Sequence, residues 1–379
     1  MSRQASHFSR RSFLQATSAA SAALALRMVT EPMLAYAAAP SHPPHAKDAV
    51  LLNANENPLG PCSAAREAVI AITPQSGRYL DERTDELSAL FARDLGVSAE
   101  QVAIYAGSTP GLNFTVRAFC SPHASYVTAE PGFEGGWFAA ERAGARVVNV
   151  PLTKTYAHDV KAMLAAGPDA GVFYVCNPNN PTGTLTSHAD IEYLAENKPK
   201  QAIVLVDEAY IHFCDAPSAV DLVQAGKDVV VLRTFSKIYG MAGLRCGFAI
   251  GRPELLEKIH NYGGYNFMPV TAVAAATASL RDAQLVEQRR QINTQVRQAT
   301  FQWLDRNGYS YIPSVTNFFL LDTKRPGKEL IAAMAQQNVV IGRVWPALPT
   351  YSRITVGTSD EMTQFQTALQ KVMKGSVSG

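Results

Sequence analysis

The amino-acid sequence predicts an α/β protein, in which a mostly parallel sheet is sandwiched by helices and accompanied by a smaller α+β domain. Short apolar segments alternate with helical patterns from about residue 79 to residue 250. Polar motifs stand directly after several of these segments, and ligands bind at the carboxyl ends of strands in open α/β sheets. From residue 266 onward the pattern changes to long helices and short strands, which is typical of a second unit.

Composition and charge exclude several classes of partner. The 379-residue chain is 47% hydrophobic and 17% charged, which is typical of a globular protein. With 34 Lys and Arg residues against 32 Asp and Glu residues, its net charge is close to zero, so neither nucleic acid nor a membrane surface is expected as a partner. The five cysteines are scattered without metal-ligand spacing, so we predict no metal site and no disulfide framework.

Residues 1–37 have the features of a twin-arginine signal peptide. The run S-R-R-S-F-L at residues 9–14 is followed by a weakly apolar stretch, and A-Y-A at residues 35–37 offers two small side chains, Ala35 and Ala37, for cleavage. Arg27 interrupts the stretch, which is too short and too polar to span a bilayer. We therefore expect export of the folded protein to the periplasm; the alternative is a disordered or amphipathic tail on a cytoplasmic protein.

The next segment combines turn formers with a short helix. Residues 40–47 are rich in Pro and His and indicate an extended arm, and N-A-N-E-N-P-L-G-P at residues 53–61 is dense in turn formers. Ser63 is expected to cap a helix that runs to residue 72. The three asparagines of the turn segment either form Asx turns or offer their side chains to a ligand.

A candidate anion site follows. A helical pattern with acidic residues at 85 and 86 ends at Gly96, and residues 101–105 form a short apolar strand. The turn A-G-S-T-P-G at residues 106–111 leads into a helix at 112–119. A strand, a glycine-hydroxyl turn and a helix in this order aim backbone N–H groups at an anion.

Four more apolar strands are expected at residues 125–128, 145–150, 172–176 and 202–206. Three of them run into polar motifs, which are E-P-G-F at 130–133, N-P-N-N-P-T-G at 177–183 and D-E-A-Y at 207–210. Asp207 directly follows a buried strand, where a carboxylate needs a partner. The partner is either a ligand or, if Asp207 caps a helix or forms a local ion pair, another part of the chain.

A lysine follows the strand at residues 229–232, within R-T-F-S-K-I-Y-G-M-A-G-L-R-C-G at 233–247. A desolvated Lys237 would lose its proton readily and attack a carbonyl to form a Schiff base. Arg245 and Ser236 could hold a phosphate, because a guanidinium binds phosphate in a bidentate manner. The alternative is a surface lysine in a loop.

The remainder of the chain is expected to form the smaller domain. Helices are predicted there at residues 270–296, 328–337 and 360–374, and strands at 318–321, 339–342 and 351–356, while a helix at 254–262 ends the large domain. We therefore assign residues 79–262 to a large domain, and residues 38–78 with 263–379 to the N-terminal arm and the small domain.

Four of these motifs together indicate a family. N-P-N-N-P-T-G, D-E-A-Y, S-K-x-x-G-x-A-G-L-R-x-G and a late S-R-I-T-V-G resemble the fold-type I pyridoxal-phosphate aminotransferases of class I/II, from about Leu51 to the C-terminus. L-N-A-N-E-N-P and D-E-A-Y-I-x-F make the chain most similar to histidinol-phosphate aminotransferases. The resemblance implies a homodimer that binds pyridoxal 5′-phosphate and moves an amino group from a small-molecule donor to a 2-oxo acid such as 2-oxoglutarate.

The resemblance also implies roles for individual residues. Lys237 would form the Schiff base and then shuttle the proton between the substrate α-carbon and the cofactor, while Asp207 would pair with the ring nitrogen. The other cofactor contacts implied are Asn180 and Tyr210 at the ring oxygen, Phe133 on the ring, Ser108, Thr109, Ser236 and Arg245 at the phosphate, and Tyr79 from the other subunit. Arg353 would bind the substrate α-carboxylate, and Asn55 would lie close to the substrate.

Departures from the family pattern leave the donor open. Arg343 is the candidate to bind a substrate phosphate, but the V-W-P that follows it and its distance from Arg353 differ from the family pattern. The donor is therefore expected to be either histidinol-phosphate-like or aromatic. The same fold and cofactor also support decarboxylases, racemases and oxidative deaminases, and a binding protein without catalysis is a further alternative.

Overall fold

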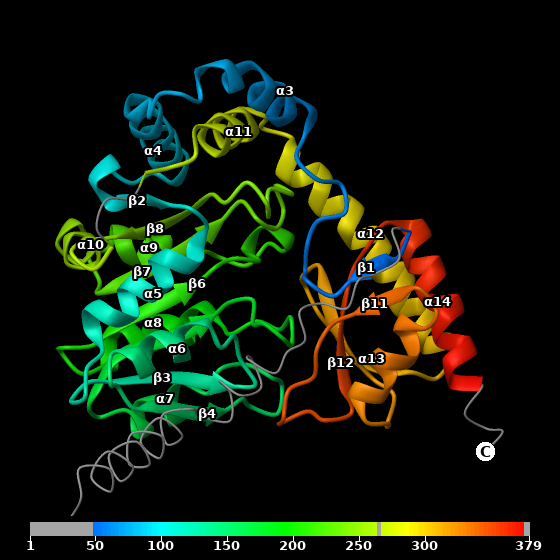
Figure 1. Cartoon of the computed structure of the whole chain (residues 1–379). Coiled ribbons are helices and arrows are strands. Elements are labelled where there is room, and N and C mark those ends of the chain that lie inside the picture. Colours follow the sequence, from blue (N-terminus) through cyan, green and yellow to red (C-terminus); the bar gives the residue numbers. More distant parts are fainter. Residues whose placement is uncertain (1–47, 264–266, 375–379) are drawn as a thin grey trace, which may run out of the picture. The chain divides into compact units, whose positions relative to one another are not determined.

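A seven-stranded sheet is the largest element of the part of the chain that this computed structural model describes, residues 48–263 and 267–374 (Figure 1). The strand order is β2-β8-β7-β6-β5-β3-β4. Neighbouring strands are parallel, except that β8 is antiparallel to both β2 and β7. The strands are β2 (Val102–Tyr105), β3 (Ser125–Glu130), β4 (Val147–Pro151), β5 (Ala170–Cys176), β6 (Ile203–Asp207), β7 (Val229–Thr234) and β8 (Gly247–Gly251). The predicted mostly parallel sheet is confirmed.

The sheet is buried on both faces. Successive side chains of a strand point to opposite sides of the sheet, so each central strand contributes to two hydrophobic clusters. Val229 and Val231 of β7 belong to one hydrophobic cluster, and Val230 and Leu232 belong to another. The first cluster receives side chains from α3 (Ser63–Ile72), α4 (Asp81–Leu95), α7 (Val160–Ala166), α8 (His188–Asn197), α9 (Val220–Gln224) and α11 (Val270–Arg281). The second receives side chains from α5 (Ser108–Phe119), α6 (Gly135–Arg142) and α10 (Pro253–His260).

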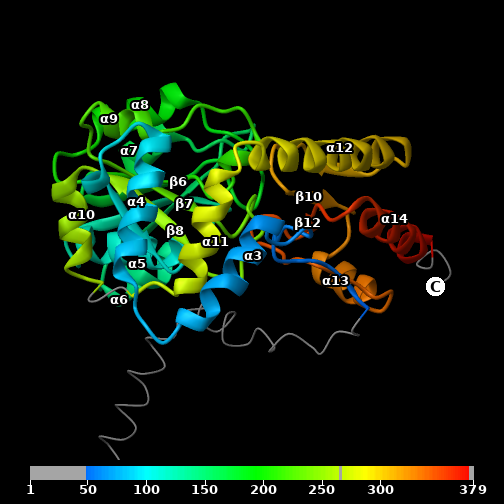
Figure 2. The same cartoon turned by 90° about the horizontal axis from the view of Figure 1, so that it is seen from above.

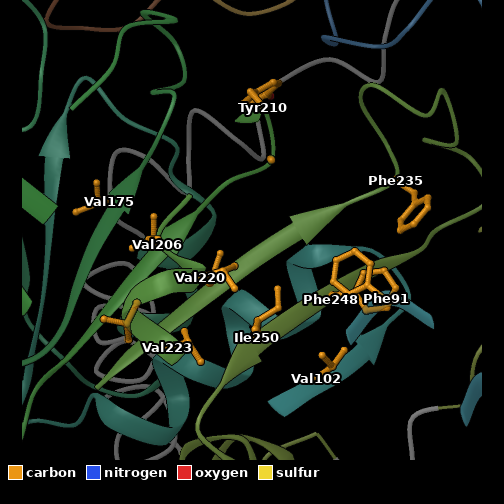
Figure 3. Close-up of a cluster of buried hydrophobic side chains, with 14 of the residues drawn as sticks. Phe91, Val102, Val175, Val206, Tyr210, Val220, Val223, Phe235, Phe248 and Ile250 are labelled. Carbon is orange, nitrogen blue, oxygen red and sulfur yellow. The ribbon is translucent and has the colours of Figure 1, made fainter. Parts of the chain in front are cut away.

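Aromatic packing joins α4 to the antiparallel strand β8. The ring of Phe91 lies parallel to that of Phe248, with 3.6 Å between their centroids, and Phe235 packs beside both (Figure 3). Large aromatic side chains bury much apolar surface, so this stack holds the β8 side of the sheet against its helices. Phe235 lies two residues before Lys237, and the stack therefore also supports the chain that presents the lysine.

The C-terminal part contains a three-stranded antiparallel sheet of order β12-β10-β9 and a parallel pair, β1 with β11. Val50 of β1 pairs with Val339, so the beginning of the described chain is built into this C-terminal part. The elements are β1 (Val50–Leu52), β9 (Ser310–Ile312), β10 (Phe318–Asp322), β11 (Val339–Ile341), β12 (Tyr351–Thr355), α12 (Leu285–Arg306), α13 (Gly327–Ala335) and α14 (Ser359–Lys374) (Figure 2). Short 3₁₀ turns are η1 (Thr73–Gln75), η2 (Ala99–Gln101) and η3 (Ile211–Phe213).

Several predicted boundaries were wrong. The single helix expected at residues 270–296 is two helices, because Asp282 takes an extended conformation and its carboxylate accepts the N–H of Gln284 at 3.2 Å. Helix α5 begins at Ser108, four residues before the expected start. Cys62, not Ser63, is the N-cap of α3. Strands β1, β8 and β9 were not predicted; all are short, and the pattern of three to five residues is too weak to identify them.

The domain boundaries stay predictions. Helices α3 and α11, which the sequence placed with the small domain, contribute Ala65 and Ala272 to the first cluster of the large sheet. The predicted signal peptide at residues 1–37 lies outside the described residues. Within the described ranges, no helix combines the length and the hydropathy needed to cross a bilayer.

Candidate active site

The carboxyl ends of the central strands meet around a cavity of about 200 Å³. Cys176, Asp207 and Thr234, the last residues of β5, β6 and β7, all line it. Nine of the predicted site residues also line the cavity, namely Ser108, Thr109, Phe133, Asn180, Asp207, Tyr210, Ser236, Lys237 and Arg245. Residues from five separate segments are thus brought together.

One end of the cavity is built to bind an anion. Ser108 is the first residue of α5, whose first turn contains no acidic residue, so free N–H groups and the positive end of the helix dipole lie there. Arg245 donates to Ser236 Oγ at 3.2 Å. Gly107 has a φ of 90°, and a Cβ atom at this position would clash with the Arg245 guanidinium. Only glycine allows this arginine to approach the helix start so closely.

The cavity is also lined by a carboxylate, that of Asp207. Its side chain is buried, and each carboxylate oxygen accepts one hydrogen bond, from Tyr174 Oη at 2.9 Å and from the Ala209 N–H at 3.1 Å. Burial raises the pKa of Asp207 to about 6, while these hydrogen bonds act in the opposite direction. A buried carboxylate of this kind is completed by a partner that donates a proton or carries positive charge.

Lys237 lines the same cavity. Its Nζ donates to the Ala54 carbonyl at 3.3 Å and lies 5.6 Å from the centroid of the Tyr210 ring. Burial lowers the pKa of Lys237 to about 8, and the positive charge of Arg353 acts in the same direction. A free amine is therefore accessible near neutral pH, as a nucleophilic lysine requires.

The wall beside Lys237 is formed by polar side chains in direct contact. Asn55 donates to the Tyr210 hydroxyl at 3.1 Å, and Arg353 donates to Asn180 Oδ1 at 2.8 Å. Asn55 is buried with a φ of 55°, a conformation that asparagine adopts more readily than most residues. Two of the three predicted substrate residues, Asn55 and Arg353, thus contact residues that line the cavity.

The Arg353 guanidinium is buried and incompletely paired. Its Nη2 donates to the Asn53 carbonyl at 2.8 Å, but its Nε has no hydrogen-bond partner. Burial lowers the pKa of Arg353 to about 10, so it stays charged at neutral pH. Among the residues that the structure describes, no carboxylate forms an ion pair with it. A buried cation without a counter-charge is a site for an anionic group of a ligand.

Two predicted site residues lie away from the cavity wall. Arg343 forms an ion pair with Glu134 and lies 4.6 Å from the centroid of the Trp345 ring. Tyr79 is 69% exposed and stacks on Phe267, with 4.7 Å between ring centroids. Tyr79 does not line the cavity.

Three residues around the site were missed from the sequence. Tyr174 lies within an apolar strand and was therefore not predicted as a site residue. A hydroxyl two residues before Cys176, near the end of the strand that leads to the site, could have indicated a polar partner. Glu134 pairs with Arg343 across 209 positions, which no local pattern indicates. Glu56 also lines the cavity, within the turn segment in which only the asparagines were considered.

Comparison with known proteins decides the family. The family model "Aminotransferase class I and II" matches residues 47–369. The chain belongs to this family. The aminotransferase is 33% identical over 334 residues to a histidinol-phosphate aminotransferase of Moorella thermoacetica, covering 86% of each chain. It is 35% identical over 337 residues to an aromatic amino acid aminotransferase of Cutibacterium acnes, covering 87% of this chain and 94% of the relative.

A solved structure shares the fold. The histidinol-phosphate aminotransferase of Sinorhizobium meliloti, in complex with pyridoxal 5′-phosphate, matches with a TM-score of 0.78 and 27% identity, over 86% of this chain and 91% of that one. Pyridoxal 5′-phosphate is the cofactor of this aminotransferase. The cavity fits this cofactor. It combines an anion site that needs glycine at position 107, the buried carboxylate of Asp207, and Lys237 with its lowered pKa.

Proposed function

We propose that this aminotransferase moves the α-amino group of an aromatic amino acid to a 2-oxo acid such as 2-oxoglutarate. The observation that carries the proposal is the buried, incompletely paired Arg353 guanidinium beside Lys237. A guanidinium binds a carboxylate in a bidentate manner, so Arg353 would hold the α-carboxylate common to the donor and to the acceptor. Asn180 and the Asn53 carbonyl hold Arg353 in place for this contact.

Each group of cavity residues would contact a different part of the cofactor. Ser108, Thr109, Ser236 and Arg245 would hold the phosphate, Asp207 the ring nitrogen, Asn180 and Tyr210 the ring oxygen, and Phe133 one face of the ring. When bound, the cofactor withdraws electrons from the substrate α-carbon. Lys237 Nζ would take the proton from that carbon, because its lowered pKa brings the free amine within reach near neutral pH.

The surroundings of Trp345 favour an uncharged side chain on the donor. The buried indole donates to the Gly132 carbonyl at 3.2 Å, and the Arg353 guanidinium lies 5.4 Å from its ring centroid. The second arginine, Arg343, is neutralised by Glu134. A donor bound to Arg353 would therefore meet an aromatic surface rather than a free positive charge.

A second candidate donor is an amino alcohol phosphate such as histidinol phosphate. Arg343 and Arg353 both lie beside the Trp345 ring, so release of Arg343 from Glu134 would offer two guanidinium groups to a phosphate. The name of the Moorella thermoacetica relative is consistent with this donor.

The half-reaction tests both donors. Purified protein with bound cofactor is mixed with phenylalanine, tyrosine or histidinol phosphate without acceptor, and the visible absorption band is followed as the amino group is transferred. We expect conversion with the aromatic amino acids and recovery of the band with 2-oxoglutarate. Conversion by histidinol phosphate alone would establish the second candidate. Release of carbon dioxide or peroxide without an acceptor would contradict amino-group transfer as the physiological reaction.

A homodimer would complete the site with Tyr79. Support comes from large side chains that are exposed in the single chain, namely Leu59, Ile70, Tyr79, Tyr262 and Phe267. Tyr79 and Phe267 stack on each other as an exposed aromatic pair, and exposed apolar surface of this kind marks interaction sites. Two inactive variants, Lys237→Ala and Tyr79→Ala, are refolded together; a mixed dimer has one site with both native residues. Restored activity of the mixture supports the shared site, and a monomer by light scattering would refute it.

Export by the twin-arginine route would place this activity in the periplasm. The support is the S-R-R-S-F-L run and the apolar stretch that follows it. Cell fractionation should find the mature chain in the periplasm, and the substitutions Arg10→Lys and Arg11→Lys together should retain it in the cytoplasm. An unchanged cytoplasmic location of the unaltered protein would refute the proposal.

A further inference from the structure

We propose that Tyr174 is a positioning residue for the cofactor site, whose hydroxyl orients the Asp207 carboxylate toward the ring nitrogen of pyridoxal 5′-phosphate. The inference concerns the cofactor and not the donor, so it is independent of the substrate proposed above.

The geometry comes from two neighbouring parallel strands. Tyr174 on β5 is paired in register with Leu205 on β6, and Cys176 is paired with Asp207. Tyr174 therefore lies two residues before the position on β5 that is opposite Asp207. Its hydroxyl donates to Oδ2 of Asp207 at 2.9 Å, and the Ala209 N–H donates to Oδ1 at 3.1 Å. With one donor on each oxygen, the carboxylate cannot rotate without losing a hydrogen bond.

The hydrogen bond between Tyr174 and Asp207 lies inside an apolar core, where its loss would be costly. Tyr174 is fully buried among apolar side chains, where a hydroxyl is costly unless it is paired. A phenylalanine would fill the same volume without that cost. The observed pair is thus a polar contact inside an apolar core, and its one acceptor is the carboxylate that serves the cofactor.

The hydroxyl also opposes the effect of burial on the charge of Asp207. Burial raises the pKa of Asp207 to about 6, and the Tyr174 hydrogen bond lowers it. Without that bond the pKa would rise further, and a larger fraction of Asp207 would be protonated near neutral pH. The other titratable groups that influence Asp207 or are influenced by it are Tyr126, Cys176, Glu208, Tyr210 and Lys237.

The chain provides a matched control one strand away. Tyr126 on β3 is also fully buried, and its ring centroid lies 5.9 Å from that of Tyr174. In the described part of the chain, its hydroxyl has no hydrogen-bond partner. Tyr126→Phe removes the same atom from the same core without removing a hydrogen bond to Asp207.

The experiment compares Tyr174→Phe and Tyr126→Phe for the affinity of the cofactor between pH 5 and pH 8.5, measured on the apo proteins by fluorescence quenching. In the unaltered protein, binding should weaken as the pH falls through about 6, because Asp207 becomes protonated. Tyr174→Phe should move this midpoint to higher pH and weaken binding about tenfold at pH 6. Tyr126→Phe should stay within about twofold of the unaltered protein.

An unchanged midpoint in Tyr174→Phe, or an equal shift in both variants, would overturn the proposal. If Tyr174→Phe does not fold, a fluorinated tyrosine introduced at position 174 keeps the ring and makes its hydroxyl a stronger donor. The midpoint should then move to lower pH, and a fixed midpoint would equally refute a positioning role.

Discussion

The two sides of the cavity are built in different ways. The cofactor side comes from residues that directly follow adjacent strands, such as Asp207 at the end of β6 and Lys237 shortly after β7. The proposed substrate side depends on Arg353, whose guanidinium contacts Asn180 and Asn53 across 173 and 300 positions of the chain. One sheet therefore brings the segments of the cofactor side together, whereas the substrate side also needs Arg353 from β12 of the separate three-stranded sheet.

The largest effect is expected from Lys237→Ala on the cofactor side. Loss of both the nucleophile and the proton carrier should reduce amino-group transfer by about 10⁴-fold. The substitution should leave the fold unchanged, because the lysine stands in a loop after β7. Single-turnover absorbance measures the rate, and circular dichroism checks the fold. Retention of a tenth of the activity would show that another group moves the proton.

Arg353→Gln should separate the two sides. Removal of a buried guanidinium should lower kcat/KM for an amino acid donor by about 100-fold while the cofactor affinity changes little. The matched variant on the other side, Arg245→Gln, should weaken cofactor binding by about tenfold or more, with activity restored by excess cofactor. If both variants lost cofactor and donor affinity alike, the two sides would not be independent.

Glu134→Gln should sharpen the description of the substrate side. Release of the half-exposed Arg343 should raise kcat/KM for donors with a distal phosphate or carboxylate about fivefold relative to phenylalanine. The double variant with Arg343→Gln should abolish this gain. A gain that survives in the double variant would mean that another residue binds the distal anion.

The smallest effect is expected from the positive charge of Arg353 on the pKa of Lys237, which links the two sides of the cavity. The pKa of Lys237 is lowered to about 8, so the rate at which apo protein attaches the cofactor should rise about tenfold per pH unit below 8 and level off above it. Because the positive charge of Arg353 helps to lower this pKa, Arg353→Gln should move the midpoint to higher pH. Stopped-flow absorbance across the pH range measures both curves, and identical midpoints would exclude the coupling.

Most of the residues on the cofactor side could be identified before the structure was known. Apolar strands followed by polar turns predicted the parallel sheet, and nine predicted residues line one cavity. The resemblance to the family supplied most of these residues. They lie together because a buried strand and the turn after it are neighbours in the chain, and the turns after parallel strands meet at one edge of the sheet. The roles of the individual residues remain predictions that the variants above test.

Only the tertiary structure decided the rest. It showed that β8 is antiparallel within the sheet, that Tyr174 donates to Asp207, and that Glu134 neutralises Arg343. Each of these depends on which distant segments pack together. Such packing is set by burial over the whole molecule, and no short window of sequence contains it.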